Sequence, residues 1–197
     1  MSEQPKRDLF VLVADLDAEN AISALVMRHD SARIRPIAFD PAQDVLRYFG
    51  RDSGCCAKAV EILRGVLRTH QHSLVFFDRE GCGRDAESRE IIEDDIEKRL
   101  APTGWDDRAK VVVFEPELES WVWGSSPHVA AELGWPTLQE LRLFLREDGW
   151  LGDAGDAKPL RPKEAMEAAL RARGEPRSPR RFKALAEKVG RLQECKD

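Results

Sequence analysis

The sequence predicts an α/β protein with a mostly parallel, four-stranded sheet flanked by helices, followed by a helical extension. Two observations support this fold class. Four short apolar runs alternate with segments of helical periodicity, as is typical of β-α-β units. This alternation stops at Gly124, and the apolar residues beyond it keep only helical spacing. We therefore expect an α/β domain over residues 8–124 and a helical extension over residues 125–197 packed on it.

The expected strands are short runs rich in β-branched and aromatic residues. They are Leu9–Ala14, Arg33–Phe39, Ser73–Phe77 and Lys110–Phe114. An acidic residue follows each of them in turn: Asp15, Asp40, Asp78 and Glu115. Because parallel strands point the same way, these acids are candidates to meet at the carboxyl edge of the sheet. An acid after a strand also commonly caps the next helix, so the pattern alone leaves both interpretations open.

Helices are expected between the strands. Asp17 suits the N-cap position of the first helix. The next two helices are expected at about Gly54–Thr69 and Asp85–Leu100. Ile91 is expected on the buried stripe of the helix from Asp85. His70 and His72 follow the second helix and are interpreted as an exposed helix end rather than a metal site. Pro116 suits the first position of a further helix, which would place Glu119 one turn beyond Glu115. The extension should contain helices at Pro127–Leu133, Thr137–Arg146, Pro162–Arg173 and Pro179–Val189.

Length and composition are those of one globular domain with an appendage. The chain has 197 residues and a formal net charge of −5, and no run is apolar and long enough to cross a membrane. Its amino-terminal residues do not resemble a secretory leader. The four cysteines, including Cys195, show no zinc-site spacing. Free thiols in such a chain indicate a cytoplasmic location, and we expect no membrane partner.

The acids that follow the strands suggest a metal site. Asp78 and Glu80 lie two residues apart, so an extended chain directs both carboxylates to one side. Mg²⁺ and Mn²⁺ prefer oxygen ligands of this kind. The candidate metal ligands are Asp15, Asp78, Glu80 and Glu115, with Glu119 as an outer member. A cation held there could polarise a phosphoryl oxygen and activate a water, which is the chemistry of phosphodiester hydrolysis.

The carboxyl-terminal part of the chain is richer in Lys and Arg than in Asp and Glu. It could hold a nucleic-acid backbone, or it could simply form solvated helix faces. The candidate nucleic-acid contacts are Lys158, Lys163, Arg180, Arg181 and Lys183. The sequence has no Walker lysine loop, no Gly-x-Gly-x-x-Gly after the first strand and no Gly-x-Ser-x-Gly elbow, which disfavours the nucleotide-binding and serine-hydrolase classes.

Together these features resemble the Toprim family, which includes topoisomerases, primases and nucleases. The resemblance extends from Leu9 to about Val189. It is carried by Asp15 after the first strand, by Asp78-Arg79-Glu80 after the third, and by the α/β alternation. The stretches Glu115–Trp121 and Lys158–Leu185 are similar to a small Toprim-related bacterial family found beside defence genes. The overall pattern is similar to a component of the methylation-associated antiphage defence system.

The resemblance implies a role for each matching acid. Asp15 takes the position of the family's general acid or base, and Asp78 with Glu80 takes that of its metal pair. Glu115 and Glu119 match the acidic motif of the smaller family. The sequence departs from the family pattern in having Asp15-Leu16 where Glu-Gly is usual, and Asp78-x-Glu80 where Asp-x-Asp is usual.

Two functions fit these residues. The first is a Mg²⁺- or Mn²⁺-dependent nuclease, or another phosphodiester hydrolase, of a bacterial antiphage defence system acting on DNA or RNA. The alternative is a catalytically inactive Toprim-derived subunit that binds other proteins of that system. The departures from the family motifs are compatible with a weakened or lost catalytic activity, because Mg²⁺ tolerates changes in ligand geometry poorly.

Overall fold

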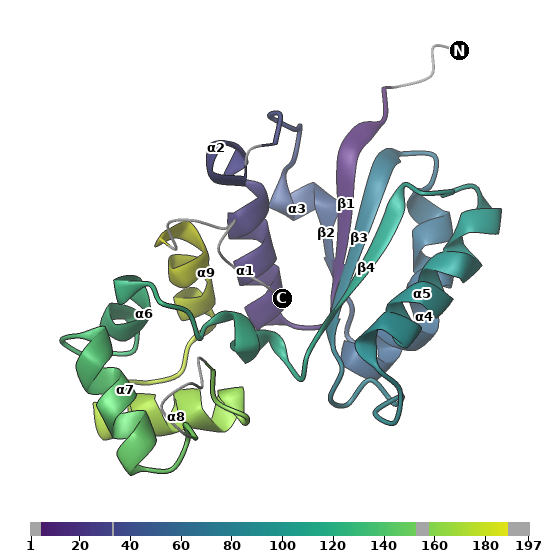
Figure 1. Ribbon diagram of the computed structural model, residues 1–197. Helices are drawn as coiled ribbons and strands as arrows, with labels where there is room; N and C mark the ends of the chain where they lie inside the picture. Colours follow the sequence, from purple (N-terminus) through teal and green to yellow (C-terminus); the bar gives the residue numbers. More distant parts are fainter. Residues whose placement is uncertain (1–4, 33, 153–157, 189–197) are drawn as a thin grey trace. The chain divides into compact units, whose positions relative to one another are not determined.

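The computed structural model describes residues 5–32, 34–152 and 158–188, shown as ribbons in Figure 1. Arg33, Val189 and Cys195, which entered the sequence predictions, lie outside the described residues. The chain forms two compact units. The first comprises residues 1–19 and 35–116, and the second comprises residues 20–34 and 117–197. The chain therefore passes from the first unit to the second twice, once within its first helix and once between Pro116 and Glu117.

The first unit is built on a parallel sheet. Among the described residues, the strands β1 (Arg7–Val13), β2 (Val45–Arg47), β3 (His70–Asp78) and β4 (Ala109–Phe114) lie in the order β2-β1-β3-β4 (Figure 1). Every strand pair in this order is parallel. This confirms the predicted α/β class with a four-stranded parallel sheet flanked by helices.

The second strand differs from the one predicted. Residues 34–40 have no regular structure, and Asp40 caps the short helix α3 (Pro41–Asp44) by accepting the Ala42 N–H at 3.0 Å. The strand beside β1 is instead β2, which pairs with Val11–Val13. The prediction was wrong because a three-residue strand has almost no periodicity of its own. The strand β2 forms because the adjacent strand β1 offers it unpaired backbone groups.

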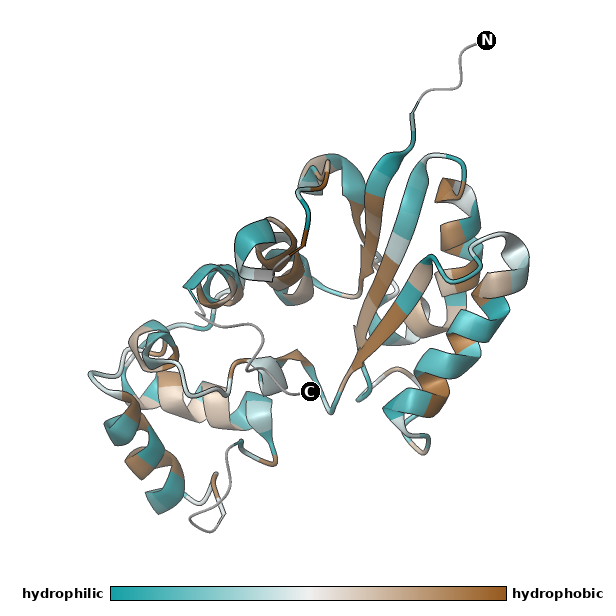
Figure 2. Ribbon diagram, turned by 45° about the horizontal axis from the view of Figure 1, so that its top comes forward, coloured by the Kyte–Doolittle hydropathy of each residue, from teal (hydrophilic) through white to brown (hydrophobic). Residues whose placement is uncertain are grey.

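Helices α4 (Arg51–Val66) and α5 (Arg89–Leu100) cover one face of the sheet, and the 3₁₀ helix η1 (Ala101–Thr103) follows α5. Their apolar residues pack with alternate residues of the strands. The fully buried members of this core include Leu12, Leu63, Phe77, Ile92, Ile96, Leu100 and Trp105. The predicted stripe of α5 was wrong at Ile91, whose exposed fraction is 54%. Figure 2 shows hydrophobic residues along the strands and mixed polarity on the flanking helices.

The helix expected from Asp85 begins later, at Arg89. Asp85 instead holds the turn that follows β3, because its Oδ1 accepts the Gly81 N–H at 3.0 Å. Gly81 has a φ of 82° and Gly83 a φ of 85°, in the left-handed region that glycine adopts without strain. The turn between Asp78 and α5 is therefore an ordered part of the carboxyl edge of the sheet.

The second unit is helical, as the carboxyl-terminal periodicity predicted. Its main elements are α6 (Pro127–Glu132), α7 (Leu138–Glu147), α8 (Pro162–Ala172) and α9 (Pro179–Lys188), with the short α2 (His29–Ala32) and the 3₁₀ helix η2 (Leu118–Trp121). Helix α1 (Leu16–Val26) begins in the first unit and continues in the second. Among the described residues, no helix combines the length and the apolar character that crossing a membrane requires.

Candidate functional site

Acidic residues gather at the carboxyl edge of the sheet in the first unit. In the register of β1 and β3, Val13 lies opposite Phe76. Asp15 and Asp78 each come two residues later: Asp15 follows the end of β1, and Asp78 is the end of β3. Asp78 is the last residue of β3 and lies opposite Phe114 of β4, and Glu115 follows directly. The structure thus places Asp15, Asp78 and Glu115 at one edge.

Asp15 also has a structural role. Its Oδ1 accepts the Ala18 N–H at 2.8 Å, and its carbonyl accepts the Glu19 N–H at 3.1 Å. Asp15 is therefore the N-cap of α1, and the prediction that Asp17 caps this helix was wrong. The carboxylate is half-buried. Since a carboxylate has two oxygens and about four lone-pair sites, one capping bond does not exhaust its capacity as a ligand.

Asp52 is a fourth acid at this edge, and it was not among the predicted ligands. It lies in the first turn of α4, and its Oδ1 accepts the Asp78 N–H at 2.9 Å. Burial raises the pKa of Asp52, the bond from Asp78 opposes this, and the negative charge of Asp15 adds to the rise. Asp52 therefore lies near the carboxylate of Asp15 and is bonded to the backbone of Asp78. Only a weak signal in the sequence pointed to Asp52, which lies two residues before the start of the helix predicted from Gly54.

The other two predicted ligands of the first unit are exposed. Glu80 lies beyond the end of β3, and its backbone N–H donates to the Pro116 carbonyl at 3.1 Å. Glu115 forms an ion pair with Arg79, with 2.5 Å between Oε1 and Nε. The predicted helix start at Pro116 was wrong, because η2 begins only at Leu118. Glu119 is therefore not one helical turn above Glu115.

In the second unit, Glu117 and Glu119 are both buried, with exposed fractions of 5% and 3%. Glu117 Oε1 accepts the backbone N–H of Lys163 at 3.0 Å, and the Lys163 Nζ lies 3.7 Å from Glu117 Oε2. Arg177 donates to Glu119 Oε1 at 2.6 Å and also pairs with Glu167. Burial raises the pKa of Glu119 to about 7, although the charge of Arg177 opposes the rise. A carboxyl group with such a pKa can exchange a proton near neutral pH.

The predicted nucleic-acid contacts divide into two groups. Arg181 is mostly buried and donates to the carbonyls of Glu132 and Pro176 and to the Glu175 carboxylate, so it holds loops of the second unit together. Lys163 donates its backbone N–H to the carboxylate of Glu117. Arg180 and Lys183 are exposed on α9, and Lys158 is half-buried. A polyanion could reach the exposed pair most readily.

A second buried polar cluster lies at the start of the strands, opposite the carboxyl edge. Asp44 is fully buried and accepts hydrogen bonds from Arg7 Nη2 at 2.7 Å and from the Asp40 N–H at 2.7 Å. His70 Nε2 lies 3.2 Å from Asp44 Oδ1, and His70 is 5% exposed. His70 belongs to β3, so the prediction that it lies at an exposed helix end was wrong. Its burial depends on Asp44, which is distant in sequence.

The three cysteines in the described part of the chain are buried. Cys55, Cys56 and Cys82 have free thiols in the core of the first unit. Burial raises the pKa of Cys55 to about 12 and also raises that of Cys56. A thiolate at either position is therefore disfavoured at neutral pH.

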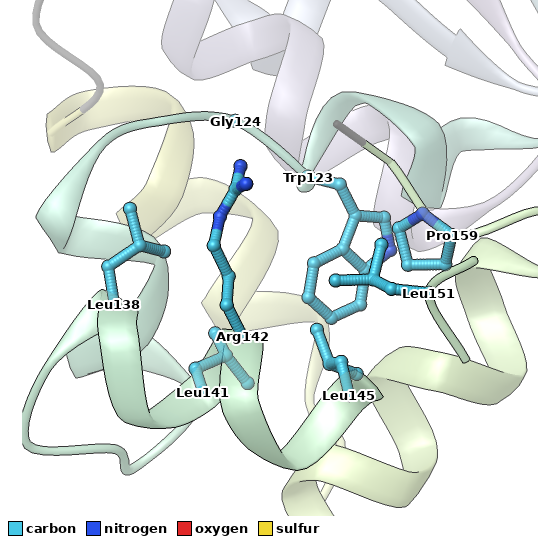
Figure 3. A pocket seen from close by; sticks show the side chains of 8 residues that line it. All are labelled: Trp123, Gly124, Leu138, Leu141, Arg142, Leu145, Leu151 and Pro159. Carbon is cyan, nitrogen blue, oxygen red and sulfur yellow. The ribbon is translucent and has the colours of Figure 1, made fainter. Parts of the chain in front are cut away.

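A small apolar pocket lies in the second unit between Trp123 and α7 (Figure 3). Its lining residues are Trp123, Gly124, Leu138, Leu141, Arg142, Leu145, Leu151 and Pro159. Its volume of about 10 Å³ is enough for one water molecule. Sites for small organic ligands typically measure several hundred Å³, so this pocket is not a candidate for one.

Comparison with known proteins identifies no relative: no protein-family model, no curated protein and no solved structure matches the chain.

Proposed function

We propose that this chain is a Toprim-like, Mg²⁺- or Mn²⁺-dependent phosphodiester hydrolase of a bacterial antiphage defence system, similar to the fourth component of the methylation-associated system. One observation carries the metal-dependent chemistry. Asp15 and Asp78 each stand two residues after the paired Val13 and Phe76 of neighbouring parallel strands, and Asp52 is hydrogen-bonded to the backbone of Asp78. The assignment to defence rests on the sequence resemblance alone.

The donor set suits a hard divalent cation. It consists of carboxylates, the ligands that Mg²⁺ and Mn²⁺ take most readily in proteins. The mutual repulsion of Asp15 and Asp52 contributes to the raised pKa of Asp52, and a bound cation would relieve that repulsion. Asp15 and Asp78 would be the candidate ligands of such an ion, with Glu80 available from the adjoining turn.

Each residue would have a distinct task. A bound cation supplies charge stabilisation at a phosphoryl oxygen and an activated water. Asp52 would hold the Asp78 backbone in place through its hydrogen bond, and Asp15 would act as ligand or proton acceptor. Arg180 and Lys183 are exposed on α9 and would contact the phosphates of DNA or RNA.

Calorimetric titration with Mn²⁺ tests the metal site. We expect saturable binding by the natural chain and its loss in Asp78→Asn. In Asp15→Asn the affinity for Mn²⁺ should fall by more than the roughly tenfold that is lost when a residue supporting a metal ligand is removed. The melting temperature should stay close to that of the natural chain, since Asn caps a helix as well as Asp does.

Asp94→Asn is the matched control, because Asp94 is an exposed acid on α5 that pairs with Lys98 at 3.5 Å. It removes one negative charge without altering the carboxyl edge. The absence of Mn²⁺ binding at millimolar concentration would refute the metal site, as would an equal loss in Asp94→Asn. Cleavage of single- and double-stranded DNA and RNA, assayed with each cation and with Asp78→Asn, then tests the reaction itself.

A second function is favoured by the structural use of two of the acids. Asp15 caps α1, and Glu115 is paired with Arg79, as would be expected of a Toprim-derived subunit that retains the fold and has lost catalysis. Such a subunit would bind other proteins of the defence system. Co-expression with the products of neighbouring genes, followed by size-exclusion chromatography, tests this. A stable complex without metal-dependent cleavage supports it, and cleavage without any complex refutes it.

A further inference from the structure

The outer edge of β4 is a feature that the proposed function does not use. In the described part of the chain, β4 is the last strand in the sheet order, and it contains the apolar run Val111-Val112-Val113-Phe114. Runs of this composition pair strongly as β-strands. An edge with unpaired N–H and C=O groups is a template for another strand. An uncovered β4 would therefore promote association.

The direction of the backbone groups follows from the bonds between β3 and β4. The Ser73 N–H donates to the Arg108 carbonyl and the Arg79 N–H donates to the Phe114 carbonyl, both at 2.9 Å. Successive residues of a strand direct their backbone groups to opposite edges. The even-numbered residues of β4 thus face β3, and the N–H groups of Val111 and Val113 point outward.

Two glutamates of α5 occupy these outward N–H groups. Val111 N–H donates to Glu97 Oε1 at 2.9 Å, and Val113 N–H donates to Glu93 Oε1 at 2.8 Å. Glu93 and Glu97 are four residues apart, so they lie on the same side of α5, which runs beside β4 (Figure 1). Glu97 is further fixed by Lys110 Nζ at 2.6 Å from Oε2. The carboxylates take the place that the carbonyls of a further strand would occupy.

We propose that the outer edge of β4 is a strand-pairing surface closed by Glu93 and Glu97, and that a second copy of this chain pairs with it when the two carboxylates are removed. A second copy fits because two β4 strands related by a two-fold axis present the same apolar sequence and pair antiparallel. The six residues of β4 also form a strand of ordinary length. Glu93 and Glu97 are thus positioned to keep the chain from associating through its sheet.

Sedimentation velocity over a range of concentrations tests this proposal. In Glu93→Ala/Glu97→Ala we expect the mass to rise with concentration to about twice that of the natural chain. Glu93→Gln/Glu97→Gln retains the carbonyl acceptors and should behave like the natural chain. Glu90→Ala/Asp94→Ala is the matched control, since it removes the same charge from α5 without uncapping β4. Circular dichroism verifies that each variant folds. If the double alanine variant does not fold, Glu97→Ala takes its place, since this single substitution uncovers only the Val111 N–H.

Hydrogen exchange provides an independent measurement. The amides of Val111 and Val113 should be protected in the natural chain, and at concentrations too low for association they should exchange at least tenfold faster in the alanine variant. The proposal is overturned if the mass of the alanine variant does not change with concentration. It is equally overturned if the glutamine variant or the Glu90/Asp94 control associates to the same extent, or if these amides exchange freely in the natural chain.

Discussion

Replacing the buried Glu119 by glutamine should make the stability of the chain less dependent on pH. Glu119 is 3% exposed, and its carboxylate is paired with Arg177. Glutamine has nearly the same shape and does not ionise. Arg177 keeps Glu167 as a partner in the variant, so the substitution removes mainly the cost of burying a negative charge.

The magnitude follows from the pKa of Glu119. Burial raises it from 4.5 to about 7, and each pKa unit corresponds to about 1.4 kcal/mol. Between these two values the unfolded chain has already lost the proton that the folded chain still binds. The stability contributed by Glu119 therefore decreases as pH rises through this window and is constant above it. The variant should gain about 3 kcal/mol relative to the natural chain between pH 4 and pH 8.

Urea denaturation followed by tryptophan fluorescence, at several pH values from 4 to 8, measures this difference. Effects of the substitution on packing are the same at every pH and cancel in the comparison. Glu147→Gln is the control, because Glu147 is exposed at the end of α7, and its stability should follow that of the natural chain at every pH. A stability difference between Glu119→Gln and the natural chain that stays constant with pH would refute the reasoning.

Two further predictions concern the first unit. Asp44→Asn should lower the free energy of unfolding by about 3 kcal/mol, the lower end of the range for a broken buried pair, because Arg7 is partly exposed. Burial would raise the pKa of Asp44, but its bonds from Arg7 and neighbouring groups hold that pKa below its usual value. The stability contributed by Asp44 is thus lost as pH falls. The stability of Asp44→Asn should therefore depend less on pH during acid denaturation. The same dependence of stability on pH in the variant and the natural chain would contradict this. Leu63→Ala should cost about 2 to 5 kcal/mol, because Leu63 is fully buried between α4 and the sheet. An unchanged urea midpoint would show that the core does not depend on it.

The candidate site was predictable in part. The acids that follow β1, β3 and β4 stand out in the sequence, and parallel strands bring their carboxyl ends to one edge. Asp52 was not found, because its relation to Asp78 depends on how α4 docks on the sheet. The burial of Glu119 and its contact with Arg177 were not found either, because the two residues lie far apart in the chain and neither belongs to a recognisable motif.

The sequence by itself determined the α/β class, the strands β1, β3 and β4, and the helical character of the carboxyl-terminal part. These features depend on apolar runs, periodicity and turn residues within a few positions of one another. Only the tertiary structure decided that Val45–Arg47 is a strand, that His70 is buried and that Glu93 and Glu97 cap β4. In each case the deciding partner is a backbone group or side chain distant in sequence, and the energy of that contact exceeds any local preference.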